Sequence, residues 1–348
     1  MLFRSLPQFT TRAPGASQQT RHPLSTIAVG SRSLIWAVVD PTYHDNAPYA
    51  GRVVQLVRSS TGAESWLLQP ALPDDSKVVQ LDGAADGTMI AMTDAGDCWQ
   101  RVHSTADWLK MQVPAGLNLA SVRVGSANNI VFQSNNEQGW EDTHTLYRYL
   151  GPGSFLELGV PGCMRDGYDV GADGTLAASI SSGQSLPRVA NHLFKTVVLG
   201  LGMDSFDTAL STITQPGDFF GLPIVRNATS IWSAKGKNLN EYVGNGTVLS
   251  HTITHVHATP DNAWAYDVWE HPLNRILGFV ATEDAVMLLL KQRSWDKLTD
   301  STLAYYKKVG ITTSDDYYQK VPQTVAMINV RDWSEEGTPN QAPTLYIP

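Results

Sequence analysis

Three histidines form the arrangement in this chain whose spacing most directly suggests chemistry. His251, His255 and His257 lie at odd positions of what the pattern predicts to be one strand, so their side chains would share a face. Imidazoles at this spacing can bind a metal ion, and Asp261 or Glu270 could add a carboxylate. The ligand set is incomplete, however. We therefore predict no metal and no other cofactor, and we keep His255 and His257 as candidate ligand-binding residues that line a channel or rim.

Tryptophan is the second residue type that could form part of a binding site. Trp36, Trp232 and Trp264 each follow a short turn by the same number of residues, and Trp99 follows an acidic turn. Their indole rings could fill the wedge between neighbouring sheets. Alternatively, they could form flat platforms for the face of a sugar or another apolar ligand. On the second hypothesis, all four are candidate ligand-binding residues.

Signatures of catalysis are weak in this sequence. Acidic neighbours such as Glu141 and Asp142 would point to opposite faces of a strand, whereas glycosidases need two facing carboxylates. Ser154 follows Gly153 without the strand, sharp turn and helix that surround a hydrolase nucleophile. We interpret the acidic segment 93–99 as a hairpin turn. The catalytic residues, if there are any, stay unknown at this point.

The elements that must position these side chains recur along the chain. An alternating strand, a polar turn rich in Gly and Asn and a second apolar strand occur at 27–36, 80–90, 121–132 and 168–177. Six residues, which we call anchor residues, mark the same point of the unit: Gly30, Ala84, Gly125, Gly171, Arg226 and Ala258. The first five are about 40 to 55 residues apart from one to the next, and the last spacing, about 32, is short for a full unit. This period is typical of the four-stranded unit of a β-propeller. The sequence thus predicts an all-β fold, a β-propeller with four-stranded antiparallel blades. Its length favours seven blades, six remain open, and a β-sandwich is the alternative.

The domain prediction follows from charge and pattern. Residues 1–25 form a basic N-terminal arm, since Arg4, Arg12 and Arg21 precede the first acidic residue, Asp40. Residues 26–348 are predicted to form a single β-propeller domain. Within it, the segment 294–306 could be a helix, with an apolar face and a serine at its N-cap.

Composition narrows the classes of partner and compartment. The chain has 42% hydrophobic and 17% charged residues, which indicates a soluble globular protein. A net charge of −8 argues against nucleic acid or an anionic membrane as the main partner, and no apolar run is long enough to span a bilayer. With two cysteines, Cys98 and Cys163, a reducing compartment is the default. We expect a cytoplasmic or non-classically exported protein; a mitochondrial transit peptide is the alternative interpretation of the arm.

One stretch carries a resemblance to a known family. The run Trp108-Leu109-Lys110-Met111-Gln112-Val113-Pro114-Ala115-Gly116-Leu117, followed by Ala120-Ser121-Val122-Arg123-Val124-Gly125-Ser126, resembles the tectonin repeat. That repeat pairs a Trp and a Pro-x-Gly-x-Leu-like turn with a Val-x-Val-Gly strand, and the resemblance extends over residues 26–179. It implies a β-propeller and, as in many tectonin-type proteins, a lectin that binds glycans in clefts between blades. Ile90, Val131 and Ala177 replace the aromatic residue of the first copy in three later copies.

Three functions remain open from the sequence. The first is a lectin-like, carbohydrate-binding propeller, whose weak sites would gain from avidity through several sites or an oligomer. The second is an enzyme of the lyase, isomerase or cyclase type that uses the axial pocket of the propeller, an expectation based on fold analogy. The third is a scaffold for protein–protein interaction. The expected partner is a glycan or another small-molecule ligand.

Overall fold

The chain forms two compact units in the computed structural model, and each is described by itself. The larger unit comprises Pro7–Ser233 and Tyr242–Val248, and the smaller one comprises Met1–Leu6, Ala234–Glu241 and Leu249–Pro348. The structure describes residues 2–4, 9–11, 20–22, 24–31, 33–42, 48–103, 107–134, 144–181, 194–213, 223–235, 238–243, 247–252, 255–258, 264–267, 275–281, 285–291, 295–297, 300–308, 310–316, 324–329 and 344–346.

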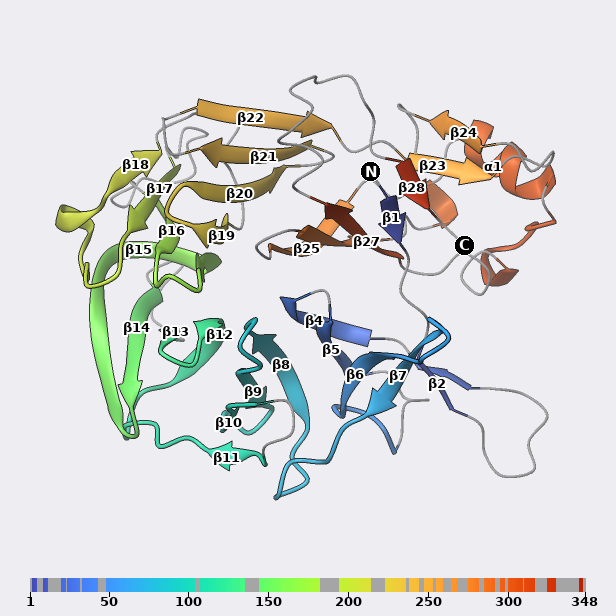
Figure 1. Cartoon of the computed structure of the whole chain (residues 1–348). Helices are drawn as coiled ribbons and strands as arrows, with labels where there is room; N and C mark the ends of the chain where they lie inside the picture. The colour runs from blue at the N-terminus through green and yellow to red at the C-terminus, as the bar shows by residue number, and fades with distance from the viewer. Residues whose placement is uncertain are drawn as a thin grey trace. The chain divides into compact units, whose positions relative to one another are not determined.

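The larger unit begins with two four-stranded antiparallel sheets, in which each strand pairs with the next along the chain (Figure 1). The first blade consists of β4 (Leu24–Ser31), β5 (Leu34–Val39), β6 (Val53–Arg58) and β7 (Glu64–Leu68). The second consists of β8 (Val78–Gly83), β9 (Met89–Thr93), β10 (Cys98–Arg101) and β11 (Leu109–Lys110). This is the expected architecture of four-stranded antiparallel units, and β11 is the shortest strand of the two sheets.

The third and fourth blades share one continuous strand. Their seven-stranded sheet contains β12 (Leu119–Ser126), β13 (Asn129–Ser134), β14 (His144–Gly151), β15 (Ser154–Val170), β16 (Leu176–Ser181), β17 (Phe194–Leu199) and β18 (Ser211–Ile213). The start of β15 pairs with β14, and its end, from Tyr168, pairs with β16. The sequence predicts a separate strand from Tyr168. Instead, a register shift between Cys163 and Tyr168 interrupts the pairing, and a bulge of this kind bends a strand without ending it.

Four complete blades are therefore present in the described part of the larger unit. A short helix, η2 (Phe206–Thr208), precedes β18, and the hairpin of β19 (Pro223–Asn227) and β20 (Ser230–Lys235) begins the next round. The strands β21 (Asn238–Val243) and β22 (Thr247–Thr252) follow. The chain is an all-β propeller with four-stranded antiparallel blades. The predicted total of seven blades is not confirmed, and the single domain over 26–348 stays a prediction.

The predicted N-terminal arm contains a small hairpin. Its strands are β2 (Phe9–Thr11) and β3 (Thr20–His22), which pair in antiparallel register. The ring of Phe9 lies 5.3 Å from that of His22 and 6.0 Å from that of Tyr49, measured between centroids. These ring contacts attach the hairpin to the first blade.

The recurring anchor residues meet where the inner strands approach one another. The strands β4, β8, β12, the end of β15 and β19 lie side by side in chain order (Figure 1). A Cβ atom added to Gly125 would overlap the carbonyl oxygen of Gly171, and one on Gly30 would overlap that of Ala84. Neither overlap is sterically allowed. Small residues therefore occupy the first four anchor positions, where adjacent blades touch through their backbones.

The hydrophobic core lies between the blades rather than within any one of them. One cluster joins the first and second blades through Trp36, Val38, Met89 and Trp99, among others. Further clusters connect the second blade to the third, the third to the fourth and the fourth to β19 and β20. Because each sheet has two apolar faces, the strands contain long apolar runs such as that of β9, whose residues are all buried.

The smaller unit combines short sheets with a helix. The strands β25 (Arg275–Ala281), β26 (Ala285–Lys291) and β27 (Thr324–Asn329) form an antiparallel sheet, β23 (His255–Ala258) pairs with β24 (Trp264–Asp267), and β1 (Leu2–Arg4) pairs in parallel with β28 (Thr344–Tyr346). The predicted helix is shifted along the chain. A 3₁₀ turn, η3, spans Trp295–Lys297, and α1 spans Asp300–Lys308, with an acidic first turn and a basic last turn that suit the helix dipole. No helix among the described residues has the length and apolarity to cross a membrane.

Candidate functional site

Two aspartates on inner strands tie one blade to the next by the same contact. Asp82 lies in β8, and its Oδ2 atom accepts a hydrogen bond of 2.7 Å from the backbone N–H of Val124 in β12. Asp169 lies at the end of β15, and its Oδ2 atom accepts a hydrogen bond of 2.7 Å from the backbone N–H of Val225 in β19. Each contact is charge-assisted when the carboxylate is ionised. A second backbone N–H, that of Gly83 at Asp82 and that of Val170 at Asp169, also interacts with each carboxyl group and lowers its pKa.

Asp86 and Asp173 follow Asp82 and Asp169 by four residues, and each accepts a hydrogen bond from a turn of the next blade. Oδ2 of Asp86 accepts a hydrogen bond of 2.7 Å from the N–H of Ala127, and Oδ2 of Asp173 accepts one of 3.2 Å from the N–H of Ala228. The turns themselves need glycine, because Gly87 and Gly174 have φ angles of 87° and 82°. Asp86 and Asp173 are exposed, unlike the partly buried Asp82 and Asp169. Asp86 and Asp173 therefore have a structural role, and Asp82 and Asp169 are the candidates for chemistry.

Arg123 occupies the same repeat position on the strand between the two inner aspartates. It lies in β12, and its charge acts on the carboxyl groups of both Asp82 and Asp169. Its guanidinium donates a hydrogen bond of 2.9 Å to the carbonyl oxygen of Val122 and lies 5.5 Å from the centre of the Tyr168 ring. A cation over an aromatic face is held in place by the ring quadrupole. Three successive inner strands thus present acid, base and cation at equivalent positions.

Burial sets the protonation of this cluster. Desolvation raises the pKa of Asp82 to about 6, and the Arg123 charge opposes that rise. Desolvation also raises the pKa of Asp169 to about 7; the negative charge of Asp82 adds to the rise and the charge of Arg123 opposes it. Burial thus brings both carboxyl groups into the range where they titrate near neutral pH, as a coupled pair.

A buried polar network behind Arg123 fixes the orientation of Tyr168. The Tyr168 hydroxyl lies 3.1 Å from Ser121 Oγ and donates to the carbonyl oxygen of Val131 at 3.4 Å. Ser121 in turn donates to Gln133 Oε1 at 3.4 Å, and Gln133 Nε2 lies 3.5 Å from Cys163 Sγ. All of these side chains are buried. A satisfied buried network of this kind makes the local geometry rigid.

This arrangement is suited to acid–base chemistry. Two neighbouring carboxyl groups with pKa values raised toward neutrality can act as base and acid in one reaction, since catalytic groups work best when their pKa lies near the working pH. A guanidinium beside them can bind a carboxylate or stabilise a developing oxyanion. Perturbed pKa values of this kind are frequent at functional sites, although structural ion pairs also cause them.

The predicted tryptophan sites lie in the inter-blade packing. Trp36 and Trp232 have no exposed surface, and the Trp36 ring lies against Gly83 of the second blade. The indole N–H of Trp232 donates to Ser230 Oγ at 3.2 Å. Trp99 is 6% exposed, and Lys110 Nζ lies 5.8 Å from the centre of its ring. These positions match the packing hypothesis, and a platform role for any of the three stays a prediction.

The predicted histidine site divides between two strands. His251 lies in β22, whereas His255 and His257 lie in β23, so the three do not share one strand as the spacing predicts. His255 and His257 do lie two residues apart in β23, where His257 pairs with Ala265, and Trp264 follows in β24 opposite Ala258. Their side chains lie outside the described part of the structure, so their ligand-binding role stays a prediction.

No metal site emerges among the described side chains, none of which form a group of three potential ligands.

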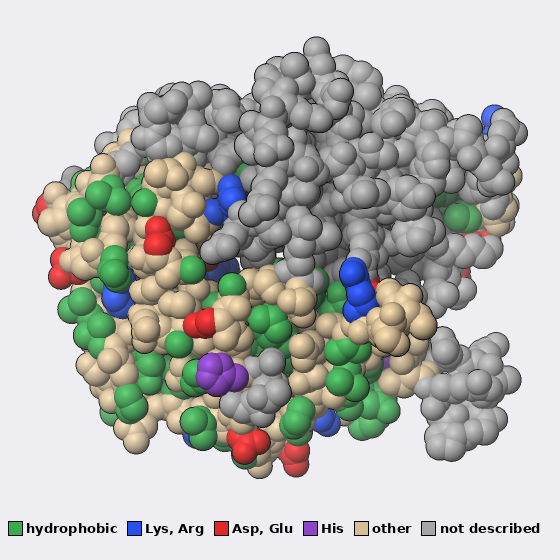
Figure 2. All heavy atoms as spheres, viewed as in Figure 1, with side chains coloured by type: hydrophobic (Ala, Val, Ile, Leu, Met, Phe, Trp, Pro, Cys, Tyr) green, Lys and Arg blue, Asp and Glu red, His purple; other side chains and the backbone are tan. Residues whose placement is uncertain are grey.

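The acidic segment 93–99 forms the expected hairpin turn: Asp97 donates its N–H to Thr93 Oγ1 at 3.1 Å, and Gly96 has a φ of 83°. On the viewed face, Lys and Arg side chains of the described residues occur as separate spots rather than as one basic patch (Figure 2).

Sequence reasoning overlooked the inner-strand cluster. Asp82, Arg123 and Asp169 each lie two residues before an anchor of the repeat, namely Ala84, Gly125 and Gly171. Polar residues at one fixed position of inner strands are a signal that aligned repeats could have revealed. The pKa values of the two aspartates depend on the packing of the three strands.

Comparison with known proteins identifies no family for this chain. No protein-family model matches it, and no curated protein matches its sequence. Solved structures with a similar backbone include a calcium-binding protein, regucalcin, from Agrobacterium tumefaciens, with 10% identity and a TM-score of 0.48 over 99% of this chain and 99% of that chain. A streptogramin B lyase has 14% identity and a TM-score of 0.46, covering 83% of this chain and 95% of that chain. YCF48 bound to a D1 peptide has 12% identity and a TM-score of 0.45, covering 84% and 90%. At this level of similarity no residue role or activity is carried over from them.

Proposed function

We propose that the protein is an acid–base enzyme of the lyase or isomerase type that acts on a small carbonyl or carboxylate compound. The site is the inner face formed by Asp82, Arg123 and Asp169 on β8, β12 and β15. One observation carries the proposal: two carboxyl groups with pKa values of about 6 and about 7 flank a guanidinium on three successive inner strands.

Each residue has a distinct role. Asp82, ionised at neutral pH, removes a proton from the carbon next to the carbonyl or carboxylate group of the substrate. The electron pair moves toward that oxygen, where the Arg123 guanidinium stabilises the negative charge. In a lyase reaction the electron pair returns from the oxygen to form a carbon–carbon double bond, the bond between the next carbon and its hydroxyl breaks, and Asp169 protonates the hydroxyl, which leaves as water. In an isomerisation Asp169 instead protonates the neighbouring carbon, while the proton of the adjacent hydroxyl passes to the former carbonyl oxygen. General acid–base catalysis of this kind contributes about 10²–10⁴-fold to a rate.

Deuterium exchange tests this proposal with a panel of compounds in place of a single substrate. The whole chain is incubated in D₂O with 2-hydroxy acids, 2-oxo acids and aldoses, and mass spectrometry follows deuterium uptake or loss of water. We expect at least one compound to react and the rate to fall about 10²-fold or more in Asp82→Asn and Asp169→Asn. Both asparagines keep an oxygen that can accept the backbone N–H, so the fold should persist.

The exposed aspartates provide the matched control. Asp86→Asn changes the same charge in the same β8 hairpin and also keeps its acceptor, so it should react at the wild-type rate. A reaction that Asp82→Asn leaves unchanged, or a panel in which no compound reacts, would reject the acid–base role.

Glycan binding between blades has less support in the described residues. Trp36 and Trp232 are fully buried, so a sugar platform would have to come from other side chains. The tectonin-type repeat, the seven blades and the cytoplasmic location stay predictions.

A further inference from the structure

A cavity lies at the outer edge of the second blade, away from the inner strands. Its volume is about 650 Å³, and its lining comes from the β9–β10 turn and from β11 with the segment after it: Gly96, Asp97, Lys110, Met111, Gln112, Val113, Pro114 and Leu117. In Figure 1, β11 is the strand of this blade farthest from β8, which carries Asp82. A ligand here would be separate from the proposed acid–base site.

The floor of the cavity is apolar and firmly supported. Met111 is buried in the core cluster that joins the second and third blades, and Val113 and Leu117 pack against the same cluster. The adjoining chain is also tied down, because Gly153 of the third blade donates its N–H to the carbonyl oxygen of Gln112 at 3.1 Å. Packed, partly exposed apolar side chains around such a hollow favour a ligand with an apolar body.

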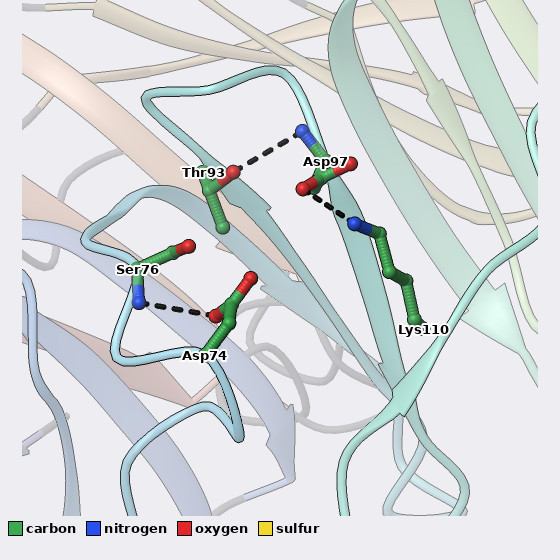
Figure 3. A network of polar contacts seen from close by, with 5 residues as sticks. All are labelled: Asp74, Ser76, Thr93, Asp97 and Lys110. Carbon is green, nitrogen blue, oxygen red and sulfur yellow. Dashed lines mark hydrogen bonds and ion pairs between the residues drawn. The ribbon is translucent and has the colours of Figure 1, made fainter.

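The charged residues of the lining, Asp97 and Lys110, lie near a second carboxylate, that of Asp74, which is outside the lining. Lys110 Nζ lies 2.7 Å from Oδ2 of Asp97, and the carboxylate of Asp74 on a neighbouring loop also attracts Lys110 (Figure 3). The charge of Lys110 also lowers the pKa of the Asp74 carboxyl, after the larger effect of the Ser76 N–H. Two carboxylates thus act on one lysine, which leaves one negative charge unbalanced.

Lys110 itself marks a place where a cation is favourable. Its ammonium group has the Asp97 carboxylate at 2.7 Å and the Trp99 ring centre at 5.8 Å. The side chain is nevertheless 52% exposed, and exposed ion pairs on flexible side chains contribute little stability. A second cation could therefore take the Asp97 carboxylate while Lys110 moves toward Asp74.

We propose that this cavity binds a small organic cation, an ammonium group attached to an apolar body. The ammonium group pairs with Asp97 at the mouth, and the apolar body lies on Met111, Val113 and Leu117. The ligand supplies the one positive charge that Asp74 and Asp97 lack.

Benzylammonium is a suitable probe, with benzyl alcohol and benzoate as neutral and anionic probes of similar shape. The measurement is the shift of the ¹³C-labelled Met111 methyl signal in the whole chain, assigned with Met111→Leu. We expect saturable binding of benzylammonium, about threefold weaker binding of benzyl alcohol, and no binding of benzoate, since an ion pair at a partly exposed carboxylate is worth about a few-fold.

Two substitutions make the test specific. Asp97→Asn should weaken benzylammonium binding about threefold, whereas Asp94→Asn, the same charge change in the same hairpin but outside the lining, should change it less than about 1.5-fold. Lys110→Met should strengthen binding several-fold, because it removes the competing cation and leaves both carboxylates. Equal affinity for benzyl alcohol, or loss of binding in Lys110→Met, would overturn the proposal. The acid–base activity at the inner face should be unchanged in these variants, so the two proposals succeed or fail separately.

Discussion

Replacing Asp169 by asparagine should stabilise the protein, and by an amount that grows with pH. Asp169 is partly buried, and its pKa of about 7 means that the folded state holds its proton more tightly than the unfolded chain does. The stability that this group contributes is fully present below pH 3.8 and is lost as the pH rises through about 7. Asparagine does not titrate, and its side-chain oxygen can still accept the N–H of Val225.

The size of the effect follows from the difference between the two pKa values. The folded value is about 7 and the ordinary value is 3.8, and each pKa unit is worth about 1.4 kcal/mol. Ionising Asp169 in the folded protein therefore costs up to about 4 kcal/mol more than in the unfolded chain. About 2 to 3 kcal/mol of this cost develops between pH 5 and pH 8.

Urea unfolding at pH 5 and at pH 8 measures this difference. Tryptophan fluorescence is a suitable signal for the larger unit, since Trp36, Trp99 and Trp232 are buried there. The quantity of interest is the change in unfolding free energy of Asp169→Asn relative to wild type, compared between the two pH values. Any loss of packing common to both conditions cancels in this comparison.

Asp173→Asn is the matched control. Asp173 makes the same type of contact, to the N–H of Ala228, from an exposed position. We expect its effect on stability to be nearly the same at both pH values. A gain for Asp169→Asn that is no larger at pH 8 than at pH 5, or identical behaviour of Asp173→Asn, would refute the reasoning.

Three further predictions follow from the same geometry. The pH–rate profile of the proposed reaction should be bell-shaped. The rate should fall below about pH 6, as Asp82 becomes protonated, and above about pH 7, as Asp169 loses its proton. A flat profile from pH 5 to pH 9 would contradict these roles. Gly125→Ala should destabilise the larger unit by about 3 kcal/mol, because its Cβ would overlap the carbonyl oxygen of Gly171. Urea unfolding measures this loss, and a value below about 1 kcal/mol would show that the strands separate easily. Trp36→Ala should cost about 3–5 kcal/mol in the same assay because it empties the wedge between two blades; a smaller loss, with a sugar affinity that disappears in the variant, would favour the platform hypothesis instead.

The repeat explains how far the fold could be predicted. Gly30, Ala84, Gly125 and Gly171 recur at a blade-like period, and the structure brings neighbouring pairs of them into backbone contact. The period is visible because the same steric demand acts once in every blade. By contrast, the continuous β15 strand could not be predicted, because a bulge and a loop leave similar patterns in a sequence.

Only part of the candidate site could be predicted from the sequence. Aromatic and histidine residues attract attention as ligand-binding types, but Trp36 and Trp232 prove to be core residues with no exposed surface. Asp82 and Asp169 look like ordinary strand-end and turn residues, and each lies beside a glycine-rich turn that explains an aspartate without any chemistry. Their raised pKa values depend on the atoms that surround them in three dimensions.

The amino-acid sequence by itself determined the β-class, the four-stranded period and the small residues at each inner-strand contact. These features are local or repeat with a fixed spacing, so they can be recognised in one dimension. Only the tertiary structure decided that Asp82, Arg123 and Asp169 lie on adjacent strands and act on one another. The three residues are about 40 residues apart in the chain, and electrostatic coupling and desolvation depend on distances in space that no spacing along the sequence specifies.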